Sequence, residues 1–146
     1  MAEPVFIDTN ILVYASNEDS LHHAKAKAVI QSINDGDLPA CLSTQVLAEF
    51  FATVTNSRKV ARPLKPGQAA EAVEGYLDSD ILKLAPNEDI LRLTLALAEQ
   101  HQVIGPDIFD AQIVATMLQN RVRTIYTANT DDFKKYSEIK TVNPLD

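Results

Sequence analysis

Short runs of β-branched and aromatic residues alternate along this chain with longer segments whose apolar residues recur at helical spacing. We predict strands in five of these runs, the last at a sheet edge: 5–7, 39–42, 81–84, 124–127 and 139–142. Strands that alternate with helices pair in parallel. The alternation therefore predicts an α/β fold, with a mostly parallel central sheet of four to five strands and helices on both faces.

Helices are expected in the segments between and after these strands, and their limits follow from capping residues, prolines and glycines. The predicted helices are 10–15, 20–33, 44–55, 66–77, 87–100, 107–118 and 131–136. The segment 58–66 contains two prolines and is expected to be a loop, and 103–106 a turn. No repeat or linker divides the chain, so we expect one domain over residues 1–146.

The charge of the chain limits the kinds of partner it can have. Its formal net charge is −7, which argues against a protein that wraps nucleic acid with a broad basic face. The charge does not exclude a site in which several acids surround a cation. The lone Cys41 cannot form an internal disulfide, residues 1–4 lack the features of a secretion signal, and no apolar run could span a membrane. We therefore expect a cytoplasmic protein.

Three acidic residues lie where parallel-sheet topology brings side chains together, at the carboxyl ends of strands or the margins of the next helices. Each also has an ordinary explanation: Asp8 as a helix N-cap, Glu49 as a solvated helix residue, and Asp110 as the capping-box partner of Asp107. A buried cluster of like charges is costly unless a cation neutralises it. Oxygen ligands without a histidine or cysteine set favour Mg²⁺ or Mn²⁺ over Zn²⁺.

Other catalytic patterns are poorly represented. The chain has no glycine-rich phosphate loop and no G-x-S-x-G nucleophile elbow. Adjacent His22 and His23 diverge on a helix, and His101 falls near a helix C-terminus, where a favourable dipole contact is its simplest explanation. The acidic residues are therefore the main candidates for chemistry.

Four segments, in order, resemble the PIN-domain ribonucleases, and at this length the VapC-type toxins of prokaryotic toxin–antitoxin pairs. They are VFIDTNIL at 5–12, LAEF at 47–50, FDAQIVAT at 109–116 and IYTANTDDF at 125–133. The resemblance implies a PIN-like α/β/α sandwich, a Mg²⁺ or Mn²⁺ cofactor and endonucleolytic cleavage of RNA. It also implies a cognate antitoxin and a homodimer as partners.

Carried across by position, Asp8, Glu49 and Asp110 would be the metal ligands. Many relatives have an aspartate where this chain has Asn129, and we favour Asp132 as the fourth carboxylate. This departure leaves the number of bound metals open. The resemblance also places four polar residues around the acids, where they would orient the carboxylates. They are Thr9, Asn10, Thr127 and Asn129. Asp107 is expected to be only a cap.

The densest basic stretch of the chain lies in the predicted loop and comprises Arg58, Lys59, Arg62 and Lys65. These side chains could contact RNA phosphates beside the acidic site, or they could belong to a solvated loop.

Two functions other than the nuclease also fit part of this sequence pattern. A phosphatase of the haloacid-dehalogenase kind also begins with a strand ending in aspartate, but it needs a second aspartate two residues later, where this chain has Asn10. A catalytically silent PIN-like module that binds RNA or protein is the other alternative, and the neutral Asn129 keeps it open.

Overall fold

The central sheet has five strands, and all of them are parallel. The computed structural model describes residues 3–146, and its strands are β1 (Val5–Ile7), β2 (Ala40–Ser43), β3 (Leu82–Leu84), β4 (Thr124–Tyr126) and β5 (Lys140–Val142). Their order across the sheet is β3-β2-β1-β4-β5. The predicted α/β class is confirmed, and the last strand lies at an edge as expected.

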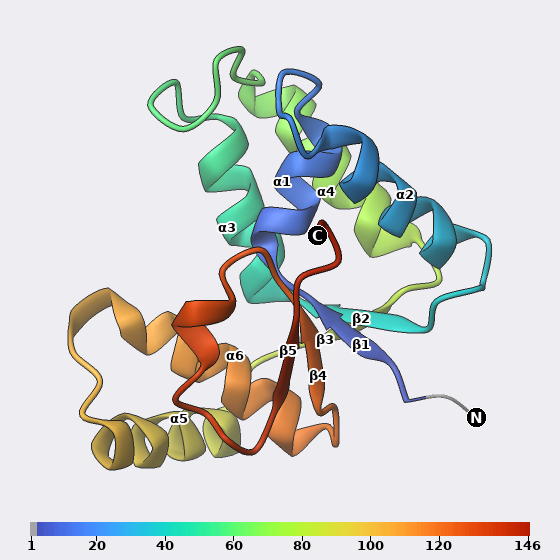
Figure 1. Cartoon of the computed structure of the whole chain (residues 1–146). Coiled ribbons are helices and arrows are strands. Elements are labelled where there is room, and N and C mark those ends of the chain that lie inside the picture. The colour runs from blue at the N-terminus through green and yellow to red at the C-terminus, as the bar shows by residue number, and fades with distance from the viewer. Residues whose placement is uncertain (1–2) are drawn as a thin grey trace.

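Helices cover both faces of the sheet (Figure 1). Helices α1 to α4 lie on one side, and α5 and α6 pack together on the other. Their bounds are α1 (Thr9–Ser16), α2 (His23–Asn34), α3 (Thr44–Val54), α4 (Pro66–Asp78), α5 (Glu88–His101) and α6 (Ile108–Gln119). Two 3₁₀ turns, η1 (Gly105–Asp107) and η2 (Thr130–Phe133), precede α6 and follow β4. No helix within residues 3–146 is long and apolar enough to cross a membrane.

The segment 131–136, predicted to be a short helix, forms only the 3₁₀ turn η2 and a further turn after it. Phe133 and Tyr136 are both 1% exposed, and the Tyr136 amide donates to the Phe133 carbonyl at 3.1 Å. Side chains three residues apart are aligned in a 3₁₀ turn. The bond from residue 136 back to residue 133 is the 3₁₀ pattern, so the tighter turn replaces a regular helix here.

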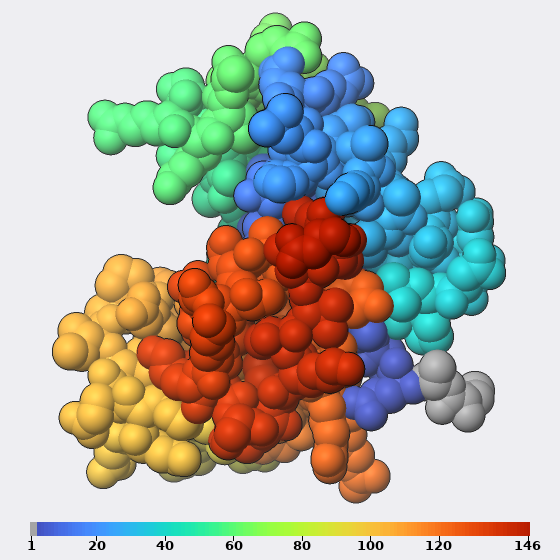
Figure 2. Space-filling view, in the orientation of Figure 1, coloured from blue at the N-terminus to red at the C-terminus, as the bar shows by residue number. Residues whose placement is uncertain are grey.

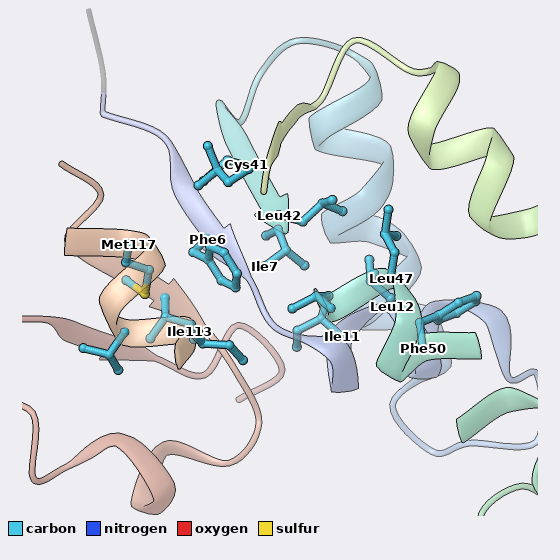
Figure 3. Close-up of a cluster of buried hydrophobic side chains, with 14 of the residues drawn as sticks. Phe6, Ile7, Ile11, Leu12, Cys41, Leu42, Leu47, Phe50, Ile113 and Met117 are labelled. Atoms are coloured by element: carbon cyan, nitrogen blue, oxygen red, sulfur yellow. The ribbon is translucent and has the colours of Figure 1, made fainter. Parts of the chain in front are cut away.

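Strand β1 is the centre of the core, and successive side chains point to opposite faces of the sheet. Phe6 faces Ile113 and Met117 of α6, whereas Ile7 lies on the side of α1 and α3 (Figure 3). Phe6 and Ile7 are fully buried. This packing fixes the direction in which the chain leaves β1 and therefore the position of Asp8.

The strand order reverses between β1 and β4. From β1 the chain builds outward to β2 and β3 on one side, and it later returns to build β4 and β5 on the other. In open parallel sheets such a switch point leaves a crevice at the carboxyl ends of the strands, where ligands bind. The Asp8 amide donates to the Tyr126 carbonyl at 3.0 Å, so the ends of β1 and β4 meet at this crevice.

Candidate active site

A pocket of about 380 Å³ opens at the switch point between β1 and β4. Four separate parts of the chain contribute an acid to its lining: Asp8 after β1, Glu49 on α3, Asp110 on α6 and Asp132 on η2. In the space-filling view the surface is hollowed between the green segment that follows α3 and the orange segment around η2 (Figure 2). The structure therefore brings together all four carboxylates that the sequence analysis selected.

Asp8 is the most buried of these acids, with 6% of its surface exposed. One carboxylate oxygen accepts from the Thr9 amide at 2.8 Å, and the other accepts from the Thr127 hydroxyl at 2.9 Å and the Asn10 amide group at 3.2 Å. Asp8 also occupies the N-cap position of α1, so the capping explanation and the site explanation both hold. Burial raises the pKa of Asp8 to about 6, although these hydrogen bonds act in the opposite direction.

Asn10 and Thr127 join the end of β1 to the end of β4. The Asn10 side chain donates to the Thr127 hydroxyl at 3.1 Å and accepts from the Ala128 amide at 2.9 Å. The Thr127 hydroxyl accepts in turn from the Asn129 amide at 3.0 Å. Of the four groups predicted to orient the acids, Thr9, Asn10 and Thr127 thus bond to the Asp8 carboxylate, and Asn129 joins the network through its backbone amide.

Glu49 is half-buried and bonded on both of its oxygens. The Thr9 hydroxyl donates to one at 3.2 Å, and the side-chain amide of Gln45 donates to the other at 2.7 Å. Gln45 was not selected from the sequence, although a glutamine four residues before a glutamate lies on the same face of a helix. Its amide nitrogen also donates to the Phe109 carbonyl at 3.0 Å, and its oxygen accepts from Gln112 at 2.7 Å.

Asp110 and Asp132 lack such partners. Within residues 3–146 no hydrogen bond reaches either carboxylate, and the pKa of Asp110 is raised to about 7 by burial and then by the charges of Asp8, Asp132 and Glu49. The prediction that Asp107 serves as a cap is wrong. Asp107 stands at the N-cap position of α6 but its side chain makes no capping bond, because η1 leads directly into α6 and fixes this residue in a helical conformation. Its carboxylate instead faces a small cavity beside Asp110.

The lining of the pocket fits a hydrated divalent cation. Its acids are oxygen ligands, and no histidine or cysteine lines it. Among residues 3–146, no group of three acidic, histidine or cysteine side chains lies close enough together to hold a metal ion directly. Mg²⁺ commonly keeps several of its waters and is held through one or two carboxylates. The raised pKa values of Asp8 and Asp110 show that negative charge is destabilised here, and a cation would relieve that destabilisation.

Comparison with known proteins identifies the family of this site. The sequence profile of the PIN domain matches residues 5–139. The chain belongs to the PIN domain family. Ribonuclease VapC43 of Mycobacterium tuberculosis is 30% identical over 141 residues, which cover 96% of this chain and 95% of that protein. Ribonuclease VapC24 of the same organism is 28% identical over 140 residues, or 95% of each chain.

Solved PIN-domain toxins share the fold. The crystal structure of Mycobacterium tuberculosis VapC20 has a TM-score of 0.70 at 19% identity, covering 93% of this chain and 98% of that one. The crystal structure of DNA-bound VapBC from Salmonella typhimurium has a TM-score of 0.67 at 18% identity, covering 98% of this chain and 99% of the matched chain. The predicted PIN-like sandwich is thus confirmed.

Within this PIN fold, both candidates for the fourth acidic position line the pocket. Asn129 follows β4 at the exposed mouth, and Asp132 lies one turn later on η2. The charge of Asp132 contributes to the raised pKa of Asp110, whereas Asn129 carries no charge. Of these two residues, Asp132 therefore supplies the negative charge at this edge of the pocket.

The four basic residues of the predicted loop do not share one place in the PIN domain. Lys59 lines the acidic pocket. Arg62 instead makes two hydrogen bonds of 2.8 Å to Asp19, in a separate pocket beyond α1. Arg58 and Lys65 are exposed, and Lys65 precedes α4. Nothing in the sequence distinguished Lys59 from Arg62, because the position of Asp19 depends on the tertiary fold.

Proposed function

We propose that this PIN domain is a divalent-metal-dependent endoribonuclease and acts as the toxin of a toxin–antitoxin pair. The convergence of four acids from β1, α3, α6 and η2 on one pocket carries the proposal. The relatives of matching length, which are VapC ribonucleases, support it. Asp8, Glu49 and Asp110 would hold a hydrated Mg²⁺ or Mn²⁺, in part through its bound waters, and Asp132 would complete the acidic site.

The bound cation would supply positive charge to the scissile phosphate and acidify the attacking water. The protein's own contribution is orientation. Asn10 and Thr127 hold Asp8 in place, and Gln45 and Thr9 hold Glu49, so the acids need little rearrangement when the substrate arrives. Asp132 has no hydrogen-bond partner among the described residues and is exposed at the pocket mouth, so it is the group we assign to accept the proton of the attacking water.

The decisive test compares RNA cleavage by wild type, Asp8→Asn and the control Asp37→Asn, whose aspartate is exposed and outside the pocket. Wild type and control are expected to cut RNA with Mg²⁺ or Mn²⁺ and to stop in excess EDTA. Asp8→Asn is expected to keep its circular dichroism spectrum and lose cleavage. Full activity of Asp8→Asn, or activity in EDTA, would reject the proposal, and RNA binding without cleavage by wild type would favour the silent module.

The partners follow from the same proposal. Solved structures similar in fold include a toxin–antitoxin complex from Klebsiella pneumoniae and the Salmonella VapBC complex. We therefore expect a cognate antitoxin, and a guanidinium group inserted among the four carboxylates would satisfy their charge. A homodimer and a cytoplasmic location, where Cys41 stays reduced, belong to the same hypothesis. Co-expression with the product of an adjacent short reading frame, followed by co-purification, tests the antitoxin.

The phosphatase alternative loses support from the contacts of Asn10. That position would need a catalytic aspartate, but here the amide nitrogen donates to Asp8 and Thr127 and the amide oxygen accepts from the Ala128 amide. The side chain is thus committed to holding two strand ends together. Release of inorganic phosphate from p-nitrophenyl phosphate, measured in parallel with RNA cleavage, would support the phosphatase alternative.

A further inference from the structure

An open groove of about 520 Å³ extends from the acidic pocket between α3 and the start of α6. Glu49 and Asp110 line both the pocket and the groove, so the two are continuous. Beyond these acids the groove becomes apolar, and its remaining lining is Gln45, Ala48, Ala52, Pro106 and Phe109. If a phosphate of the substrate is held at the acids, the chemical group attached to that phosphate lies next to this groove.

Phe109 is an unusual residue for an exposed position. It is 55% exposed, and it is the aromatic member among the large apolar side chains exposed within residues 3–146. The other four phenylalanines are buried or half-buried: Phe6, Phe50, Phe51 and Phe133. An aromatic ring left open to solvent beside a catalytic pocket provides a flat face on which another ring can stack.

The position of Phe109 is fixed, although its ring is open to solvent. Its backbone carbonyl accepts from the Gln45 side chain at 3.0 Å, and that side chain is held by Glu49 at 2.7 Å and by Gln112 at 2.7 Å. One glutamine thus connects the metal-binding face of α3 to the first turn of α6. A platform that is already in place at a defined distance from the acids loses little entropy when a ligand binds.

The opposite wall of the groove leaves space beside this ring. Ala48 and Ala52 lie four residues apart on one face of α3, both are exposed, and each presents only a methyl group. Small side chains on this wall leave the volume of the groove, about 520 Å³, open beside the Phe109 ring. Within residues 3–146, the structure gives the groove no arginine or lysine that would contact a second phosphate, which favours a base over the sugar–phosphate backbone as its occupant.

We propose that this groove is a nucleobase subsite, in which Phe109 stacks on the base of a nucleotide adjoining the scissile phosphate. The inference rests on the proposed ribonuclease function and adds to it a substrate-binding residue. Gln45 is the positioning residue of this subsite, because it holds both Glu49 and the backbone of Phe109. Because every base has a stacking face, the subsite favours unpaired RNA over duplex without selecting a base by hydrogen bonds.

Binding of two labelled 12-nucleotide chains tests the subsite: oligoadenylate, and a ribose–phosphate chain of equal length without bases. Fluorescence anisotropy is measured with Mg²⁺ for Asp8→Asn, for Asp8→Asn with Phe109→Leu, and for Asp8→Asn with Leu95→Ala. Leu95 is the matched control, since it is 54% exposed on α5 and lies outside the groove. Phe109→Leu should weaken adenylate binding by about tenfold, as expected for one lost stacking contact, and should leave the abasic chain and the control within twofold.

Equal effects of Phe109→Leu on both chains, or no effect on either, would overturn the subsite. A change in molar mass by light scattering, without base-dependent loss of affinity, would also overturn it and identify the groove as a protein interface. Fluorescence of 2-aminopurine placed at successive positions of the adenylate should be quenched at one position by Phe109 and restored by Phe109→Leu. Since these measurements do not require cleavage, a wild-type protein that binds in this way but does not cut RNA would refute the ribonuclease function and leave the subsite standing.

Discussion

The acidic pocket has two halves that are built differently. Asp8 and Glu49 accept five side-chain or capping hydrogen bonds, from Thr9, Asn10, Gln45 and Thr127. Asp110 and Asp132 accept none from residues 3–146, and they lie on α6 and η2, across the pocket. Hydrogen bonds orient the carboxylates of the first half, whereas the fold places the carboxylates of the second half without such bonds.

The difference shows which carboxylates the protein orients before a cation or substrate binds. Orientation of Asp8 is supplied by two strand ends and two side chains, so its geometry is ready in the free protein. Burial and its acidic neighbours raise the pKa of Asp110 to about 7, so this carboxyl binds a proton more readily than an ordinary aspartate does. We therefore expect cation binding to displace a proton from the unpartnered half and to fix its carboxylates.

Removal of the Asp110 charge should have the largest effect and tests whether the unpartnered half is needed for activity. Asp110→Asn is expected to reduce the single-turnover rate of RNA cleavage by about a thousandfold, because loss of a ligand removes several kcal/mol of charge stabilisation. Asp37→Asn is again the control, since Asp37 is exposed and lies outside the pocket. A rate for Asp110→Asn within tenfold of wild type would contradict the assignment.

The half of the pocket that contains Asp8 and Glu49, here called the ordered half, should lower the free energy of unfolding of the cation-free protein at neutral pH. The pKa of Asp8 is raised from 3.8 to about 6, so between about pH 4 and pH 7 the folded protein binds more protons than the unfolded chain. Stability contributed by protonated Asp8 is thus present below pH 4 and is lost as the pH rises through 6. From two pH units at 1.36 kcal/mol each, the loss is about 2–3 kcal/mol.

Urea unfolding in EDTA at pH 4.5 and pH 8 measures this loss, and Asp8→Asn serves as the reference. Wild type should lose more stability than the variant between the two pH values, and Mg²⁺ should restore part of it at pH 8. The same pH dependence in both proteins would show that the hydrogen bonds of Asp8 compensate fully for its burial.

The hydrogen bonds of the ordered half can be weakened without changing its charge. Thr127→Val keeps the shape of the side chain but removes the donor to Asp8, and Thr127→Ser keeps the donor. We expect cleavage to fall by about 10- to 100-fold in the valine variant, as for other groups that orient a metal ligand, and by less than threefold in the serine variant. Equal rates in the two variants would mean that the Thr127 hydroxyl does not position Asp8.

The fold and the acidic residues could be predicted from sequence because short stretches of neighbouring residues indicate both. Apolar periodicity and turn residues gave the alternation of strands and helices, and Asp8 directly follows the β1 run in a motif of several residues. The contacts of Gln45 could not be predicted, because its partners Phe109 and Gln112 are more than 60 positions away in the chain. The failed cap at Asp107 has a similar cause, since the backbone of η1 rather than local capping chemistry sets its conformation.

The smallest expected effect is on RNA affinity when Lys59 is replaced. Comparing Lys59 with Arg62 tests whether a cationic side chain at the pocket contacts a phosphate. Lys59 lines the pocket beside Asp8 and Glu49, whereas the guanidinium of Arg62 is bonded to Asp19 outside it. Lys59→Ala should weaken RNA binding a few-fold and reduce the slope of log affinity against log salt by about 0.7, the value for one phosphate contact on a single strand. Arg62→Ala should leave affinity and slope unchanged, because Asp19 pairs with the Arg62 charge outside the pocket. If both variants alter the slope equally, the loop acts as a diffuse basic surface, and the position of Lys59 in the pocket carries no special role in binding.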